Sequence, residues 1–286
     1  MKKRFWLGLL FLCGGLVYGA DTKLEDMAED TSPTSDDIIY VVDDPAGTPA
    51  DKKVTFANVQ QLVAPVLTEN TTVNFTSGMT AAEMQALIDA VPKNINGYNL
   101  YFDFGDGTYN TSMTSALEFY YFYNGSISIR GNTGESGLHT NQAVALDFSA
   151  GTSSGLDIRY CQHVLVSNLK ITVSDTNFAT CVYGRYNTYV VVRGCYLIGA
   201  GKSNAPMGIR ASFGGDLYAE DNYVNNLEYG FYTTDIAKLF SDVNDDTGTS
   251  PNYGLSAISG STIIKSSTQP AGSTSNEATA TGGEIR

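Results

Sequence analysis

A repeated segment restricts the fold of this chain more than any other feature of its sequence. Three stretches, 159–171, 185–197 and 212–224, align without gaps, and their first residues lie 26 and 27 positions apart. The same class of residue recurs at equivalent positions in all three. A period of about 20 to 30 residues with short strands in each unit is typical of a solenoid. Because a single turn cannot bury its own apolar side chains, the turns must stack and share one core.

The alignment predicts which side chains face inward. Equivalent residues of stacked turns lie about 4.8 Å apart, the spacing of strands in a sheet. An Asn at a bend, such as Asn222 or Asn132, can bond its neighbours in the stack, so a polar residue is tolerated there. The predicted inward columns are Val164/Val190/Leu217, Val166/Val192/Ala219, Leu169/Cys195/Asn222 and Ile171/Leu197/Val224, with Tyr160/Tyr186/Phe213 as an aromatic stack.

These columns predict an all-β chain folded as a right-handed parallel β-helix. The hand follows from the general chirality of parallel crossover connections. An antiparallel β-sandwich would also show many short strands separated by turns. A sandwich does not explain repeats that keep both their register and their residue classes, so the parallel β-helix is favoured.

One helix is expected ahead of the repeats, over residues 81–91. Thr80 and Glu83 have the spacing of a capping box at its N-terminus. Its apolar residues recur at helical spacing and form a single stripe, which needs another surface to cover. We therefore expect the helix to cap the N-terminal end of the coil stack and to block edge-to-edge association there. The stripe consists of Met84, Leu87, Ile88 and Val91.

The remaining segments divide the chain into regions. Residues 1–20 read as a signal peptide, since three basic residues precede an apolar stretch shorter than the roughly 20 residues needed to span a bilayer. No later segment is a candidate membrane span. Residues 21–37 are acidic and poor in large apolar residues, as in a disordered linker. Residues 38–68 form a small hairpin-like module with a helix expected over 57–67, the β-helix covers 69–265, and 266–286 are expected to be a flexible tail.

Charge limits the partners of this chain. Without the signal peptide, 14 of its 17 Lys and Arg would face 30 Asp and Glu, a formal charge of about −16. Such a surface repels phosphate backbones, which argues against nucleic acid. It suits neutral glycans, basic partners or divalent cations such as Ca²⁺, although no resident cofactor is required. The small N-terminal module cannot bury a core alone, so it is expected to dock on a partner or on itself in a homo-oligomer.

The run 80–92, followed by Phe102-Asp103-Phe104-Gly105-Asp106-Gly107-Thr108-Tyr109, resembles the opening of pectate-lyase-like β-helix proteins. In that family an amphipathic helix caps the β-helix, and an Asp-Gly-Thr-Tyr turn precedes the first coil. Residues 36–62 resemble a small module of phage tail and tailspike-like proteins. The resemblance covers most of residues 36–265 and implies the fold. It implies little about activity, because such β-helices include lyases, hydrolases and inert adhesins.

Outward positions on the stacked strands are where a β-helix would bind a ligand. The repeat places His163/Tyr189/Asp216, Leu165/Val191/Tyr218 and Ser167/Arg193/Glu220 in outward columns, with Asp157/Tyr183/Arg210 and Arg159/Arg185/Ser212 on the preceding strands. Aromatic rings stack on sugar faces while charged groups hold hydroxyls. An ordinary solvated face with a weak Arg193–Glu220 ion pair is the alternative. The predicted glycan-binding residues are Tyr189, Arg193, Asp216, Tyr218 and Glu220.

Catalytic signals are weaker. A glycosidase needs two carboxylates about 5 to 9.5 Å apart, and a lyase needs clustered acids with a basic residue. Asp216, Glu220, Asp221 and Arg193 are the candidates for either. The catalytic motifs of the resembled lyases and polygalacturonases are missing. The acidic stretch 242–248 lacks the Glu that would close a Ca²⁺ site and is expected to be a solvated loop between coils. We therefore expect an exported, non-catalytic protein for surface structure, adhesion or glycan recognition, with a polysaccharide lyase or glycoside hydrolase as the alternative.

Overall fold

The computed structural model describes residues 38–42, 51–55, 65–110, 113–132, 142–151, 154–176, 178–186 and 188–286. The chain divides into two compact units, residues 1–64 and 65–286. In the first, β1 (Ile38–Val42) and β2 (Asp51–Thr55) pair as an antiparallel hairpin, as the turn-rich sequence between them predicts. The signal peptide, the linker and most of the helix expected over 57–67 lie outside the described residues. Residues 65–67 already belong to the second unit. They are not helical, and Val66 pairs with Asn94 of the same unit.

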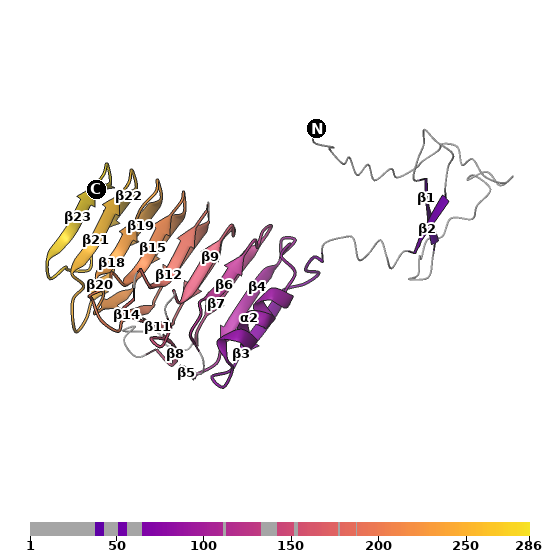
Figure 1. Ribbon diagram of the computed structural model, residues 1–286, viewed down its shortest axis with the longest axis horizontal. Coiled ribbons are helices and arrows are strands. Elements are labelled where there is room, and N and C mark those ends of the chain that lie inside the picture. Colours follow the sequence, from indigo (N-terminus) through magenta and orange to yellow (C-terminus); the bar gives the residue numbers. More distant parts are fainter. Residues whose placement is uncertain are drawn as a thin grey trace. The chain divides into compact units, whose positions relative to one another are not determined.

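The second unit is a parallel β-solenoid of about eight turns, which confirms the predicted all-β parallel class. Most turns contribute one strand to each of three sheets, and every strand pairs in parallel with its equivalent in the next turn (Figure 1). The first sheet has nine strands, the second six and the third seven.

The first sheet contains β3 (Thr71–Phe75), β4 (Asn99–Phe104), β7 (Ser126–Arg130), β10 (Val164–Ser167), β13 (Tyr189–Arg193), β16 (Asp216–Glu220), β19 (Lys238–Asp242), β22 (Thr262–Ser266) and β24 (Glu284–Ile285). The second contains β5 (Gly107–Tyr109), β8 (Val144–Phe148), β11 (Lys170–Val173), β14 (Tyr196–Gly199), β17 (Tyr223–Asn225) and β20 (Asp245–Asp246). The third contains β6 (Leu117–Tyr120), β9 (Leu156–Arg159), β12 (Thr180–Arg185), β15 (Met207–Ser212), β18 (Tyr229–Thr233), β21 (Tyr253–Ile258) and β23 (Ser275–Ala280).

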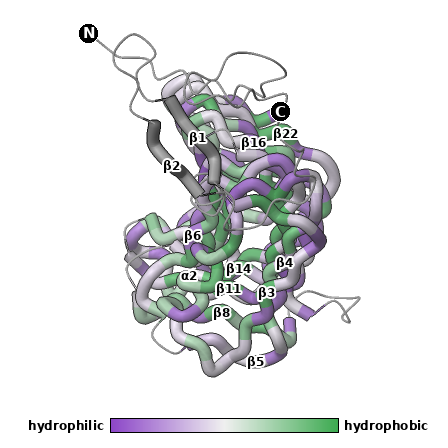
Figure 2. Tube along the Cα trace, turned by 90° about the vertical axis from the view of Figure 1, so that its right-hand side faces the viewer, coloured by the Kyte–Doolittle hydropathy of each residue, from purple (hydrophilic) through white to green (hydrophobic). Residues whose placement is uncertain are grey.

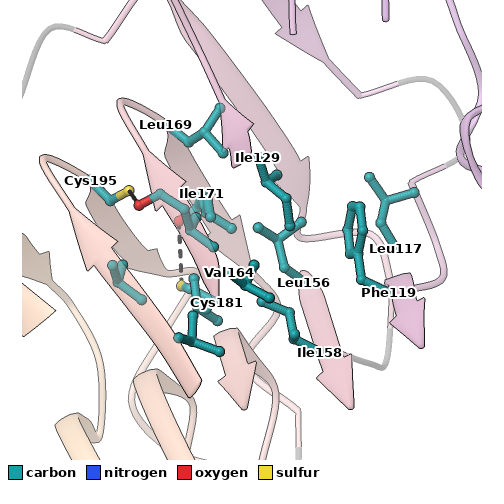
Figure 3. Packing of buried hydrophobic residues seen from close by; sticks show 14 of the residues in the cluster. Leu117, Phe119, Ile129, Leu156, Ile158, Val164, Leu169, Ile171, Cys181 and Cys195 are labelled. Carbon is teal, nitrogen blue, oxygen red and sulfur yellow. Dashed lines mark hydrogen bonds between the residues drawn. The ribbon is translucent and has the colours of Figure 1, made fainter. Parts of the chain in front are cut away.

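The predicted inward columns are confirmed. Val166 pairs with Val192, which pairs in turn with Ala219, and all three side chains are fully buried. The columns that begin with Val164, Leu169 and Ile171 are buried in the same way. Figure 3 shows side chains from several turns packing together inside the solenoid, and Figure 2 shows hydrophobic residues in the strands of all three sheets. Stacking thus merges the turns into one continuous core.

Asn222 is buried at the bend between the first and second sheets, where the repeat predicts a polar residue that bonds its neighbours. Its side-chain oxygen accepts the Cys195 N–H at 3.0 Å, and its amide nitrogen donates to the Val192 carbonyl at 2.8 Å. Asn244, one turn further on, accepts the Asn222 N–H at 2.9 Å and donates to the Ala219 carbonyl. This asparagine ladder satisfies backbone groups that the bend would otherwise leave unpaired inside the core. The interpretation of 242–248 as a solvated loop is therefore wrong at Asn244, which is fully buried.

The predicted aromatic stack is also present, and it is longer than the repeat indicates. The rings of Tyr160, Tyr186 and Phe213 stack in sequence at centroid distances of 5.0 Å, and Tyr121 extends the stack by one turn. All four residues have φ between 51° and 65°, a left-handed conformation that costs a bulky residue about 1 kcal/mol or more. Ring stacking of about 0.5 to 1.5 kcal/mol per pair offsets this cost. The stack lies at the turn between the third and first sheets, and its rings remain partly exposed.

The predicted helix is α2 (Ala81–Ala90), with Val91 as its C-cap. The capping box between Thr80 and Glu83 is formed in both directions. Met84 and Ile88 are buried as predicted, but Leu87 is 38% exposed, so the apolar stripe is narrower than its spacing indicates. The Gln85 side chain forms hydrogen bonds with both backbone groups of Glu118 and so joins the helix to β6. That the helix closes the end of the stack stays a prediction.

The expected flexible tail over 266–286 is wrong. β23 pairs in parallel with β21, and β24 pairs with β22, so these residues continue the third and first sheets. Most of their side chains are small or polar and exposed, and the exception is Ile285, which packs against the core. Backbone hydrogen bonds to the preceding turn need no apolar side chain, which is why the composition of this segment was misleading.

Candidate outer face of the first sheet

Alternation along the strands gives the first sheet an outer face with a central apolar column. On β13, Val190 and Val192 are buried while Tyr189, Val191 and Arg193 point outward. Strand pairing extends this alternation through the sheet and places the outward residues in three columns along the stack. We call the middle one the central column; it consists of Tyr101, Ser128, Leu165, Val191, Tyr218, Phe240 and Ile264.

The five predicted ligand-binding residues come together on two adjacent strands of this face. Tyr189 pairs with Asp216, and Arg193 pairs with Glu220, on either side of Tyr218. The Arg193 Nη2 atom lies 2.8 Å from Glu220 Oε1. Because the Arg193 side chain is more than half exposed, this ion pair contributes little to stability. It does hold two charged groups beside the aromatic ring of Tyr218.

Aromatic contacts fix the central column and its flank. The Tyr218 ring stacks on Phe240 at a centroid distance of 5.3 Å with an interplanar angle of 11°. Burial raises the pKa of the Tyr218 hydroxyl, and the nearby Glu220 and Asp242 carboxylates raise it further. The hydroxyl therefore stays protonated at neutral pH and can donate a hydrogen bond. On the flank, the Tyr189 ring meets His163 edge to face at 5.7 Å.

A shallow groove crosses β4, β7, β10 and β13 on the same face. Its floor is mainly apolar, with Leu165 and Val191 from the central column, and polar groups line its edges. Tyr189 forms part of its wall, which connects the groove to the predicted residues. The groove is lined by Asn99, Tyr101, Ser126, Ile127, Ser128, His163, Val164, Leu165, Tyr189 and Val191.

The catalytic candidates are not arranged as a glycosidase pair. Asp216 and Glu220 are four residues apart on β16, about 13 Å along an extended strand. Side chains directed to the same side of one strand keep that spacing, which exceeds the roughly 5 to 9.5 Å that hydrolysis requires. Asp221 follows the strand at a turn with φ 53°, so it leaves the row of outward positions. Arg193 is held by Glu220 and is not a free base.

Two residues of this face were not predicted from the sequence. Phe240 and Asp242 belong to β19, which pairs with β16 although Lys238 follows Asp216 by only 22 residues. The shorter turn breaks the period of 26 to 27. The pair Leu239-Phe240, equivalent to Leu217-Tyr218, is the signal that could have found them. Asp242 lies next to Glu220 in the register, and its Oδ1 atom is buried without a hydrogen-bond partner.

The register of the third sheet follows the predicted columns, but the prediction that Ser212 is exposed is wrong: it is fully buried, and its hydroxyl shares a 2.8 Å hydrogen bond with the Tyr183 hydroxyl. Asp157 pairs with Tyr183, and Tyr183 with Arg210. Asp157 is buried beneath two arginines: Arg185 Nη2 lies 2.7 Å from its carboxylate, and Arg159 binds it as well. This network packs the face and leaves the Asp157 side chain only 7% exposed.

The cysteines and acidic residues supply no reactive or metal centre in the described part of the chain. Cys161, Cys181 and Cys195 are free and buried. Burial raises the pKa of the Cys161 thiol to about 11 and that of Cys195 to about 12, so neither forms the reactive thiolate at neutral pH. No group of three metal-binding side chains is found among the described residues. Among the same residues, no helix is long and apolar enough to cross a bilayer.

Fold and outer face together define a parallel β-solenoid with an aromatic and apolar column flanked by charged side chains. The chain matches no protein-family model, and comparisons with curated proteins and with solved structures found no match. The resemblance to pectate-lyase-like and tailspike-like proteins therefore stays a prediction.

Proposed function

We propose that this chain is an exported, non-catalytic β-solenoid that binds a linear glycan along the outer face of its first sheet, in adhesion or surface structure. The observation that carries the proposal is the central column. Its side chains repeat at the strand spacing of about 4.8 Å and run without interruption over successive turns. A linear polymer lying along the stack would meet one apolar or aromatic contact after another.

The chemistry of the face suits sugars. The faces of aromatic rings such as Tyr218 and Phe240 offer apolar surface for the C–H groups of a pyranose. The charged side chains beside them, Arg193 and Glu220 on one flank and Asp216 on the other, offer donors and acceptors for hydroxyl groups. Both signs of charge are present on the face, which favours a neutral glycan over a polyanion.

Binding is favoured over cleavage by the arrangement of the carboxylates. Hydrolysis needs a proton donor and a second carboxylate at a fixed, short separation. On β16 the two acids are about 13 Å apart along the strand, and Glu220 is engaged by Arg193. The alternative, a lyase or hydrolase, would have to use Glu220 with its neighbour Asp242, which the register places side by side.

A polysaccharide panel, scored for both binding and release of reducing ends, tests this proposal. Tyr218→Ala should weaken binding by roughly three- to tenfold, the scale of one aromatic contact, and leave thermal stability nearly unchanged. Tyr196→Ala is the matched control, since Tyr196 lies on β14 in the second sheet. Equal losses in both variants would place the site elsewhere. Cleavage that Glu220→Gln abolishes would favour the enzyme.

A further inference from the structure

One arginine in the described part of the chain stands apart from the others. Each of the rest has a carboxylate oxygen within 4.0 Å of its guanidinium group. Arg210 has none, and it makes no hydrogen bond through its Nε atom, which is buried. The arginines with carboxylate partners are Arg130, Arg159, Arg185, Arg193 and Arg286.

Aromatic rings surround Arg210 in place of an acid. It lies on β15 between Tyr183 of β12 and Tyr232 of β18 in the register of the third sheet. Its guanidinium carbon is 4.7 Å from the centroid of the Tyr183 ring and 5.7 Å from that of Tyr232. The Phe178 ring, half exposed, contributes a third contact at 5.7 Å. Close by, Tyr229 contacts Tyr232 at 5.1 Å.

This arrangement is unusual for a chain with 30 acidic and 17 basic residues. A buried N–H donor without an acceptor lowers stability by about 1 to 3 kcal/mol. An acid placed opposite Arg210 would remove that cost, as Asp157 does for Arg159 and Arg185. Native structures seldom leave such a donor unpaired unless another group completes it.

We propose that Arg210 and its aromatic neighbours form a second binding site, for a sugar that carries a single oxyanion, either a carboxylate or a sulfate. Because the Nε atom of Arg210 is buried in the free chain, we expect the guanidinium group to turn toward solvent on binding, so that its Nε–H and one terminal N–H face the ligand together. Two parallel N–H groups of a guanidinium match the two oxygens of a carboxylate or sulfate. The exposed Phe178 ring offers the adjacent apolar surface on which the sugar ring stacks.

The charged residues near Arg210 determine which ligands this site favours. Arg159 and Arg185 on the same face share the single carboxylate of Asp157, whereas Arg210 has no carboxylate oxygen of the described residues within 4.0 Å, so these three arginines outnumber the acid that binds them. The acidic surface of the rest of the chain opposes a densely charged polymer. A sugar with one anionic substituent meets the local positive charge without that repulsion.

Three monosaccharides with the same ring test the proposal: glucose, glucuronate and glucose 6-sulfate. They are titrated into the full chain labelled with ¹⁵N, and the Arg210 Nε–H resonance is followed, after assignment by its loss in Arg210→Lys. We expect the two anions to shift this resonance and to bind roughly tenfold or more tightly than glucose, the scale of a hydrogen bond to a charged group. A stronger effect of one anion identifies the preferred oxyanion.

Matched variants separate this site from the first sheet. Arg210→Lys keeps the charge but loses the planar pair of donors, and should reduce anion binding several-fold. Phe178→Ala should reduce it as well, and Arg193→Lys on the first sheet should leave it unchanged. Equal affinity for glucose and both anions, or no binding of either anion, would overturn the proposal. Loss of binding in Tyr218→Ala together with retention in Arg210→Lys would overturn it too, and would assign anion binding to the first sheet.

Discussion

Replacing Val192 by Asp is the sharpest test of the register on which the whole outer face depends. Val192 is fully buried between Val166 and Ala219, while Val191, the next residue, points outward in the central column. Val192→Asp should therefore unfold the chain or destabilise it severely. Val191→Asp should cost no more than the roughly 1 kcal/mol span of strand propensities.

The magnitude follows from two terms. Burial of the Val192 side chain contributes about 2 kcal/mol, which the substitution removes. A carboxyl group at this buried position must stay protonated in the folded state, and at pH 7, about 3 units above its ordinary pKa, that costs roughly 4 kcal/mol. Together the two terms come to about 6 kcal/mol, which is within the roughly 5 to 15 kcal/mol by which a typical domain is stable.

The second term depends on pH, and its sign can be worked out. The unfolded chain ionises the new carboxyl near pH 4 and the folded chain only well above pH 7, so the unfolded state is increasingly stabilised relative to the folded state as the pH rises between these values. At pH 5 the penalty should be about 2.5 kcal/mol smaller than at pH 7. Both pH 5 and pH 7 lie above the isoelectric point near 4.4, where the chain would tend to precipitate.

Urea unfolding followed by circular dichroism at pH 5 and pH 7 measures both terms, with the unaltered chain as reference at each pH. Should Val191→Asp and Val192→Asp be equally destabilised, the inward and outward assignments would be wrong. A Val192→Asp penalty that does not change with pH would mean that the carboxyl reaches water, and the stacked core would then be looser than its burial indicates.

Three further predictions concern the core and the C-terminal strands. Asn222→Ala should lower the free energy of unfolding by about 1 to 3 kcal/mol for each backbone group left unpaired, measured by urea denaturation; no change would mean that water replaces the ladder. Removing residues 275–286 exposes the edges of β21 and β22, so light scattering should detect aggregation, whereas a flexible tail would be lost without effect. Because burial raises the pKa of Cys161 to about 11 and that of Cys195 to about 12, the unfolded chain releases these thiol protons first, and stability should fall as the pH rises from about 8.5 toward 11. A thermal midpoint that stays constant over that range would show that the thiols are exposed.

The repeat predicted the core because each of its positions carries one physical role. Val166, Val192 and Ala219 occupy the same place in successive turns, so an ungapped alignment is also a contact map. The same logic correctly placed Arg193 opposite Glu220. It failed where a turn changes length: β19 follows β16 after 22 residues, so Leu239-Phe240 matches Leu217-Tyr218 only if the alignment allows for a shorter turn.

Two other features were beyond sequence reasoning for different reasons. β23 and β24 carry mainly small or polar side chains, with Ile285 as the exception, and they form strands because the edge of the preceding turn supplies hydrogen-bond partners. Arg210 appeared in the sequence as one more outward cation. Arg210 differs from the other arginines because no acid among the described residues lies within reach of it. The fold instead places the rings of Phe178, Tyr183 and Tyr232 around its guanidinium group. Composition counts charges but does not show which of them remain unpaired.

A solenoid separates its core from its surface more completely than most folds do. Each inward position must fit the turns on both sides, so a change at Val192 is felt in three strands. Each outward position, such as Val191, is limited only by the pleat of the sheet, so its side chain is free to suit a ligand. A stretch of outward residues that keeps aromatic or apolar character over several turns, as the central column does from Leu165 to Ile264, is therefore not required by folding. Exposed apolar side chains aligned in this way favour aggregation unless a partner covers them, and that is the physical reason to look for a ligand on this face.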